Sequence, residues 1–86
     1  MNNNNIKLHI KKHVQLDKIY LKGDQNHIHI IAIGNIFNGL KQISRQKLIY
    51  QPLTTYIINK KIHAVTIDTF TPTEWEKENI YVNDYS

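Results

Sequence analysis

Two histidines are the residues of this 86-residue chain best suited to metal chemistry. His63 lies in the segment IHAVTIDTFTPTEW (62–75), where it shares the phase of Val65 and Ile67 and would begin the apolar face of a strand. His27 follows a polar turn and begins another apolar segment. An imidazole ring can bind a metal through one nitrogen while a hydrogen bond to the other orients it, so both rings are candidate ligands. A histidine at the edge of a core, bonded only to backbone, would look the same in sequence, and from the residues alone this is the favoured interpretation of His63.

The other three histidines are weaker candidates. His29 alternates in phase with His27, so it reaches the same strand face and the choice between them as a second ligand stays open. His9 and His13 stand four residues apart on a predicted helix, a spacing that suits a metal pair. No third ligand is evident near them, and we interpret them as solvated.

Other chemistries are excluded or poorly supported. The chain contains no cysteine, which excludes disulfides, thiol catalysis and a self-contained iron–sulfur site. Any soft metal held here would need sulfur from another molecule. Ser44 has no histidine and aspartate context, and Gly34 to Gly39 lacks the Lys-Ser/Thr ending of a phosphate-binding loop. We therefore expect no enzymatic activity.

Charge is unevenly distributed along the chain. Residues 1–67 carry ten Lys or Arg against two acidic residues, whereas residues 68–86 carry five acidic residues against one lysine. A basic body of this kind suits nucleic acid or an acidic protein face, although it is also compatible with a solvated surface. Lys41, Arg45 and Lys47 lie on a predicted helical stretch and are the candidate phosphate contacts.

Length and composition predict a single domain over residues 1–86, with residues 1–5 and 79–86 expected to fray. No apolar segment reaches the roughly 18–20 residues that span a bilayer. The first residues lack the apolar core of a signal peptide, so we expect a cytoplasmic protein.

Hydrophobic periodicity predicts the elements that position these residues. Ile6, Ile10 and Val14 recur every fourth residue, as on an amphipathic helix. The remaining predicted elements are a strand at Lys18–Lys22, a turn at Gly23–Asn26, a strand at His27–Ile33, a loop at Gly34–Gly39 with Phe37 in the core, a helical stretch from Lys41 to Ile58, and a strand at Lys61–Phe70.

The helical stretch is interrupted by Pro52, which predicts either two short helices or one kinked helix. Within it, Ile43, Leu48 and Ile49 are expected to face inward and Arg45 outward.

The segment Phe70–Trp75 predicts the start of a last helix. Thr71 suits the N-cap, Pro72 the first helical position, and Glu74 completes a capping box. Phe70 and Trp75 occupy the positions of a hydrophobic staple. Trp75 is therefore interpreted as a packing residue.

These elements predict an α+β two-layer sandwich in the order α-β-β-α-α-β-α, with a three-stranded mixed sheet and helices on one face. The first two strands form a hairpin, whereas the second and third are joined through helices and should be parallel. Parallel neighbours start at the same end of the sheet, which would bring His27 and His63 to one edge.

Three segments, HIHIIAIGNIFNGL, SRQKLIYQPL and IHAVTIDTFTPTEW, resemble the BolA family, and more closely its IbaG branch. The resemblance extends from about Ile6 to Trp75. The family pattern is matched by Phe37/Gly39, Arg45, Ile49/Tyr50, His63/Ala64 and Thr71/Pro72/Trp75. The chain departs from it at Lys41-Gln42, where many members have Ser-Arg.

The resemblance implies a fold related to class II KH domains and partnership with a monothiol glutaredoxin. In such a pair, a bridging 2Fe–2S cluster is held by glutaredoxin cysteine, glutathione and histidine. His63 corresponds to the signature ligand and His27 to the loop ligand. Part of the partner-facing surface would be formed by the region Arg45–Tyr50 with Lys60 and Lys61.

The resemblance leads to three hypotheses. The first is a non-enzymatic adaptor in iron–sulfur trafficking or iron sensing, with a link to acid stress. The second is a DNA-binding transcriptional regulator that uses the helix-turn-helix-like segment Lys41–Ile58. It is weakened because the junction Tyr50–Leu53 lacks the GxxG loop of KH domains. The third is an interaction module that has lost cluster binding, and homodimerisation is left open.

Overall fold

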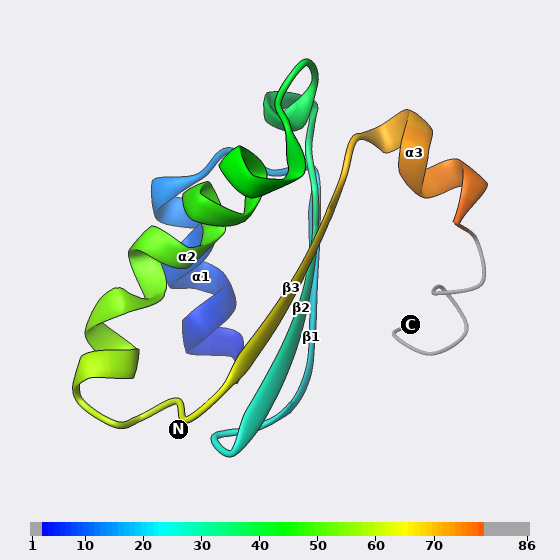
Figure 1. The fold of residues 1–86 in the computed structure, drawn as a ribbon. Helices are drawn as coiled ribbons and strands as arrows, with labels where there is room; N and C mark the ends of the chain where they lie inside the picture. Colours follow the sequence, from blue (N-terminus) through cyan, green and yellow to red (C-terminus); the bar gives the residue numbers. More distant parts are fainter. Residues whose placement is uncertain (1–2, 79–86) are drawn as a thin grey trace.

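The computed structural model describes residues 3–78, which fold into three α-helices, one short 3₁₀ helix and three strands (Figure 1). Their order is α1 (Asn3–His13), β1 (Lys18–Asp24), β2 (His27–Ile33), the 3₁₀ helix η1 (Asn35–Phe37), α2 (Gln42–Ile58), β3 (Val65–Phe70) and α3 (Pro72–Lys77). Helix α1 begins at Asn3, so residues 3–5, which were expected to fray, have helical geometry, and their fraying stays a prediction. Residues 1–2 and 79–86, which were also expected to fray, lie outside the described residues.

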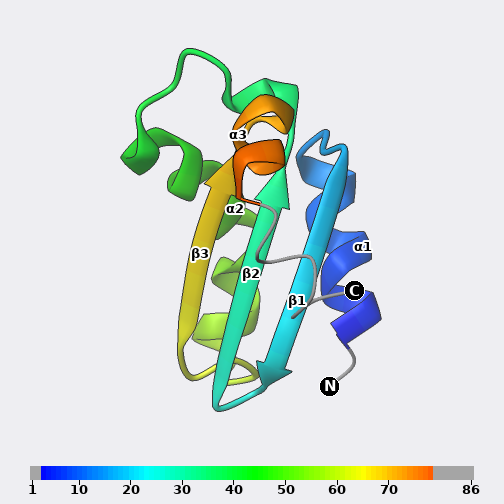
Figure 2. The ribbon, with the colours of Figure 1, turned by 90° about the vertical axis from the view of Figure 1, so that its right-hand side faces the viewer.

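The strands form one mixed sheet in the order β1-β2-β3 (Figure 2). β1 and β2 are antiparallel, with Asp24 opposite His27, and β2 and β3 are parallel, with Ile28 opposite Val65. The predicted mixed sheet and the parallel pairing are therefore confirmed.

The main core lies between the sheet and the helix pair α1 and α2 (Figure 1). The predicted stripe of α1 is fully or almost fully buried at Ile6, Ile10 and Val14. The inward-facing side of β2 contributes Ile28, Ile30 and Ala32, and Phe37 of η1 is buried with them. Burial of this apolar surface is the main stabilising contribution to the fold.

Helix α3 lies on the opposite face of the sheet, at the end where β2 and β3 finish (Figures 1 and 2). Its Trp75 joins Ile31 and Ile33 in a second, smaller cluster. The expectation that all helices cover one face therefore holds for α1 and α2 only. Alternation along β2 is the reason, because residues 31 and 33 point away from α1 and α2 and need their own apolar cover.

Helix α2 is continuous through Pro52, so the alternative of two short helices is wrong. A proline removes one backbone hydrogen bond and costs about 3 kcal/mol in a helix interior. Here Pro52 is buried, and its helix neighbours Ile49 and Leu53 belong to the core, so we attribute the tolerance of the proline to burial of this side of α2.

The chain leaves α2 through a closed turn and reaches β3 later than predicted. The Lys60 N–H donates to the Ile57 carbonyl and the Lys61 N–H to the Tyr56 carbonyl, which is the hydrogen-bond pattern of a Schellman motif. Lys60 has a φ of +60°, the left-handed conformation that such a turn requires. Consequently β3 begins at Val65 and not at Lys61.

Candidate functional site

The hairpin between β1 and β2 fixes the position of His27. Gly23 has a φ of +105°, and a Cβ there would lie 2.2 Å from the His27 carbonyl oxygen, so only glycine fits. The Asp24 carboxylate accepts hydrogen bonds from the Asn26 and His27 N–H groups at 2.9 and 3.4 Å. An Asx turn of this kind sets the direction in which the strand starts.

The ring of His27 is exposed and held by one hydrogen bond. Its Nε2 lies 2.7 Å from the Thr66 hydroxyl oxygen on β3. If Nε2 carries the proton and donates to that oxygen, Nδ1 keeps a free lone pair that can bind a metal. The Thr66 hydroxyl thus orients the ring, and it can accept from Nε2 in the tautomer that leaves Nδ1 available.

His63 lies in the loop before β3 and is exposed, so the prediction that its ring begins the apolar face of the strand is wrong. The inward position is taken by Ile62, which is only 1% exposed. The backbone of His63 is well anchored, because its N–H donates to the Gln25 carbonyl at 2.8 Å. Within residues 3–78 its ring makes no hydrogen bond, which leaves both nitrogens accessible.

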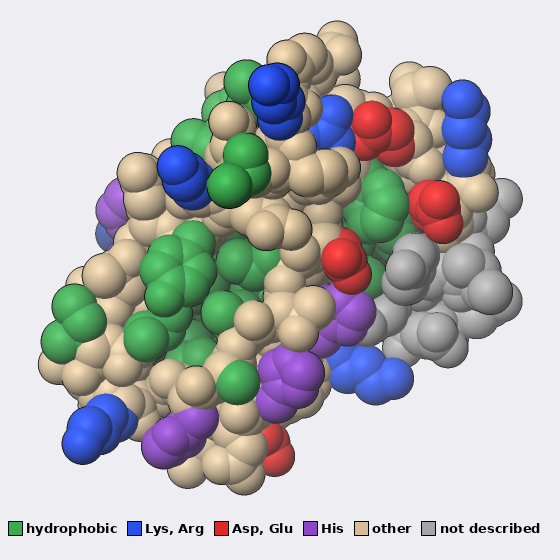
Figure 3. Space-filling model, viewed as in Figure 1, with side chains coloured by type: hydrophobic (Ala, Val, Ile, Leu, Met, Phe, Trp, Pro, Cys, Tyr) green, Lys and Arg blue, Asp and Glu red, His purple; other side chains and the backbone are tan. Residues whose placement is uncertain are grey.

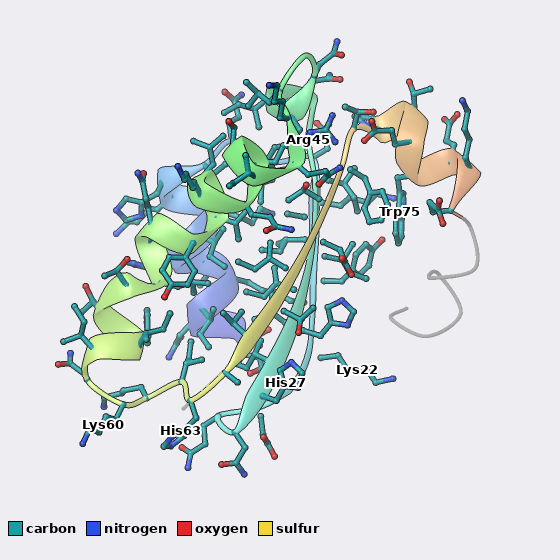
Figure 4. All side chains as sticks on the ribbon, viewed as in Figure 1. Lys22, His27, Arg45, Lys60, His63 and Trp75 are labelled. Atoms are coloured by element: carbon teal, nitrogen blue, oxygen red, sulfur yellow. The ribbon has the colours of Figure 1, made fainter. Side chains whose placement is uncertain are left out.

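Parallel pairing brings the two histidine-bearing segments together. The Ile28 N–H donates to the Ala64 carbonyl at 3.0 Å, so the residues that precede Ile28 and Val65 are neighbours in space. Figure 4 shows His27 and His63 at the end of the sheet where β2 and β3 begin. We call His27 and His63 the histidine edge. Their predicted placement at one end of the sheet is confirmed, whereas their role as ligands stays a prediction.

The histidine edge is not a complete metal site. No group of three or more His, Cys, Asp or Glu side chains that could hold a metal ion occurs within the described chain.

His29 differs from His27 in its surroundings, although both point to the face of the sheet that carries α3. Its Nε2 lies 2.6 Å from an Asp68 carboxylate oxygen, and its side chain is 28% exposed. A carboxylate partner on one nitrogen and partial burial make this ring less accessible than that of His27.

His9 and His13 form no metal pair in this arrangement. The His9 Nε2 lies 2.8 Å from the Pro52 carbonyl oxygen, and the His13 Nδ1 lies 2.9 Å from the His9 carbonyl oxygen. A carbonyl oxygen only accepts, so both nitrogens must donate. His9 therefore ties α1 to α2, a structural contact that its sequence position did not reveal.

Arg45 is buried, so the prediction that it lies on an exposed basic surface is wrong. It is 6% exposed, and its Nε donates to the Leu40 carbonyl at 2.9 Å. Its two terminal nitrogens donate to the Glu74 carboxylate at 2.7 and 3.3 Å. The sequence contained a sign of this burial, because Arg45 stands at four-residue spacing with the apolar residues Ile49 and Leu53 and so lies on the same helix face.

This ion pair joins α2 to α3. Hydrogen bonding from the Arg45 guanidinium, followed by that from the Thr71 N–H, holds the pKa of Glu74 below its ordinary value. The predicted capping box is confirmed, since the Glu74 N–H also donates to the Thr71 hydroxyl at 3.2 Å. The predicted staple is confirmed too, with the Phe70 and Trp75 rings 5.3 Å apart.

The remaining candidates for phosphate contacts are Lys41 and Lys47, both exposed. The helix-turn-helix-like segment is a single helix, so that part of the DNA-binding hypothesis is contradicted. Lys and Arg side chains are scattered over the face shown in Figure 3. None of the helices in the described residues is both long and apolar enough to span a membrane.

Comparisons with known proteins agree with this architecture. A family model described as BolA-like protein matches residues 3–74. The chain is 52% identical over 77 residues to a protein of Buchnera aphidicola subsp. Acyrthosiphon pisum, covering 90% of this chain and 96% of that one. It is 36% identical over 78 residues to the acid stress protein IbaG of Escherichia coli K12, covering 91% and 93% respectively.

Among solved structures, the Bol-like protein of Babesia bovis matches with a TM-score of 0.76 at 19% identity, covering 92% of this chain and 94% of that one. At this identity the match speaks for the fold alone. The sequence relatives and the family model carry the assignment further, and together they establish that the chain belongs to the BolA family.

Proposed function

We propose that this protein is a non-enzymatic adaptor that pairs with a monothiol glutaredoxin and helps to ligate a bridging 2Fe–2S cluster. His63 is the principal ligand from this chain and His27 the second. The observation that carries the proposal is the histidine edge, where two exposed rings stand on neighbouring segments of a chain without cysteine.

The donor set fits such a cluster. Imidazole nitrogen is an accepted iron–sulfur ligand, and replacing thiolate by histidine removes negative charge and raises the reduction potential. The Thr66 hydroxyl orients the His27 ring, and the His63 backbone is anchored to the Gln25 carbonyl at the same end of the sheet. Glutaredoxin cysteine and glutathione would supply the sulfur ligands that this chain lacks.

The surface around the histidine edge suits an acidic partner face. Lys60 and Lys61 are exposed in the turn that precedes His63. Arg45 is no longer part of this surface, because it is engaged with Glu74. We therefore place the partner contact on the turn and the histidine edge, away from the start of α2.

Acid sensitivity follows from the ligand type. Imidazole binds a metal only when deprotonated, and free histidine titrates near pH 6.5. Cluster retention should therefore fall as pH drops through the range where imidazole becomes protonated. The relative IbaG carries the name acid stress protein, which is compatible with this property.

The decisive experiment is co-expression with a monothiol glutaredoxin, followed by analysis of iron, acid-labile sulfide and the visible spectrum of the purified pair. We expect a coloured complex whose spectrum changes and whose cluster decays faster in His63→Ala. His13→Ala, an exposed histidine on α1, is the matched control and should leave both unchanged. A complex without iron and sulfide would show an interaction module instead, and an unaltered His63→Ala spectrum would remove His63 as a ligand.

The same preparation tests the second ligand. His27→Ala should alter the spectrum, whereas His29→Ala should not, because the His29 ring is bonded to Asp68 and less accessible. The opposite result would assign the second position to His29. We do not propose DNA binding, because the segment expected to form a helix-turn-helix is the single helix α2 and Arg45 is buried.

A further inference from the structure

The outer edge of β3 is open for pairing at residues 65 and 67, whereas Thr69 is buried and its hydroxyl donates to the Gln42 side chain of α2 at 2.8 Å. The Ala64 and Phe70 carbonyls accept hydrogen bonds from Ile28 and Gly34, so the even-numbered residues of β3 direct their backbone groups toward β2. In a parallel ladder, the backbone groups of the alternate residues then point the other way. Outward-facing N–H and C=O groups therefore belong to residues 65, 67 and 69 of β3.

The molecule barely protects this edge. Among these outward backbone groups, only the Ile67 carbonyl has a partner within residues 3–78, namely the Gln46 side-chain nitrogen at 3.3 Å. Exposed edges are usually blocked by lysine, proline or a bulge. The edge strand β1 follows that rule with Lys18 and Lys22, whereas β3 contains neither lysine nor proline.

An apolar groove runs beside this edge, between β3 and α2. Its volume is about 580 Å³, and its apolar walls are Ile43 and Tyr50 from α2 and Val65 and Ile67 from β3. Ile43 is 63% exposed and Tyr50 44% exposed. Figure 3 shows hydrophobic surface in the middle of this face, between helix and strand. Ile43 was expected to face inward, and its exposure here is the exception in an otherwise buried stripe.

The β3 edge and the groove together provide the two features that an extended peptide needs, namely backbone groups to pair with and space for its side chains. A strand added to β3 would bond to its outward backbone groups, and every second side chain would enter the groove beside Val65 and Ile67. A single-stranded nucleic acid fits less well, because phosphate binding needs several cations and Lys47 is the only cation among the described residues that line the groove.

Charge selects the class of peptide. Lys47 is exposed on the rim, and Lys41 is exposed just before α2. The single acidic side chain of the lining, Asp68, is bonded to His29. The rim therefore favours an acidic occupant.

We propose that the β3 edge and the α2 groove bind an extended, acidic peptide segment of a partner protein, with alternating apolar side chains, as a fourth strand parallel or antiparallel to β3. This site adjoins the histidine edge through Thr66, which lines the groove and is hydrogen-bonded to the His27 ring, but the proposed peptide binding needs neither cluster nor glutaredoxin.

The test is an NMR titration of the isotope-labelled full chain, without metal, using a short blocked peptide of alternating valine and glutamate. We expect shift changes centred on the amides of residues 65 and 67, together with slower hydrogen exchange of the Ile67 amide. A peptide of the same length with proline in place of its central residue should bind at least about tenfold more weakly, because proline has no N–H to donate to the β3 backbone.

Substitutions at Ile43 and Lys47 can test the groove without destabilising the fold, because both side chains are exposed. Ile43→Ser should weaken binding about tenfold, and Lys47→Glu should reverse the preference toward a valine–lysine peptide. Leu8→Ser, an equally exposed change on α1, should have no effect. No shifts at millimolar peptide, shifts elsewhere, or tighter binding of a single-stranded oligonucleotide at the same residues would each overturn the proposal.

Discussion

The two ends of the sheet differ in how completely their side chains are hydrogen-bonded and buried. Where β2 and β3 finish, Arg45, Glu74 and Thr71 form a closed set of hydrogen bonds beside buried Trp75. Where they begin, the histidine edge presents exposed rings on an anchored backbone. Figure 4 shows the two groups at opposite ends. The comparison teaches that the capping motif around Thr71 stabilises the fold, whereas the histidine edge is left exposed.

The largest expected effect is at the closed end. Arg45→Met should lower the free energy of unfolding by about 2 kcal/mol, because it leaves the Leu40 carbonyl and the Glu74 carboxylate without their donor. The melting temperature should fall by roughly 10 °C in a domain of this size. Lys47→Met, an exposed neighbour on α2, is the control and should change stability little. Equal melting temperatures for the two variants would show that the ion pair contributes nothing.

Loss of the N-cap should have a smaller effect. Thr71→Ala removes the hydroxyl that accepts from the Glu74 N–H, which should cost about 1 kcal/mol in denaturant unfolding. Thr73→Ala, an exposed threonine two residues further on, serves as the comparison. If both substitutions cost the same, the cap is not what holds the start of α3.

The pH dependence of Glu74 provides a finer test of the closed end. Its pKa is lowered in the folded state from the ordinary 4.5, so it contributes stability that is fully present above the unfolded pKa. That contribution is lost as pH falls through the folded pKa. The difference in free energy of unfolding between the parent and Glu74→Gln should therefore be constant at neutral pH and become smaller in acid. Urea unfolding at a series of pH values measures it. A difference that widens in acid would contradict the assigned cause.

The smallest expected effect on stability is at the histidine edge. His63→Ala should leave the free energy of unfolding of the isolated chain within about 0.5 kcal/mol, because the ring is exposed and makes no hydrogen bond within residues 3–78. Thermal unfolding measures this directly. A loss as large as that for Thr71→Ala would mean that His63 has a structural role, and would remove the contrast between the two ends.

Local patterns predicted the parts of the fold that local interactions decide. The stripe of α1, the turn after Gly23 and the capping box at Thr71 each depend on residues within about four positions of one another. The parallel pairing of β2 and β3 was also predictable, because a helical connection between neighbouring strands requires it.

Other features depended on partners distant in the sequence. Arg45 meets Glu74 across 29 positions, and this contact decides that its side chain is buried. Helix α3 covers the second face of the sheet because Ile31 and Ile33 need cover there. We attribute the tolerance of Pro52 within α2 to burial of this side of the helix.

The candidate site divides in the same way. The sequence by itself determined which side chains can act, namely imidazole rings in a chain without thiols, and that pairing would bring two of them to one end. Only the tertiary structure decided that His63 stands exposed outside β3 and that Thr66 holds the ring of His27. The reason is physical: residue type fixes the available chemistry, whereas exposure and hydrogen-bond partners are set by packing between distant segments.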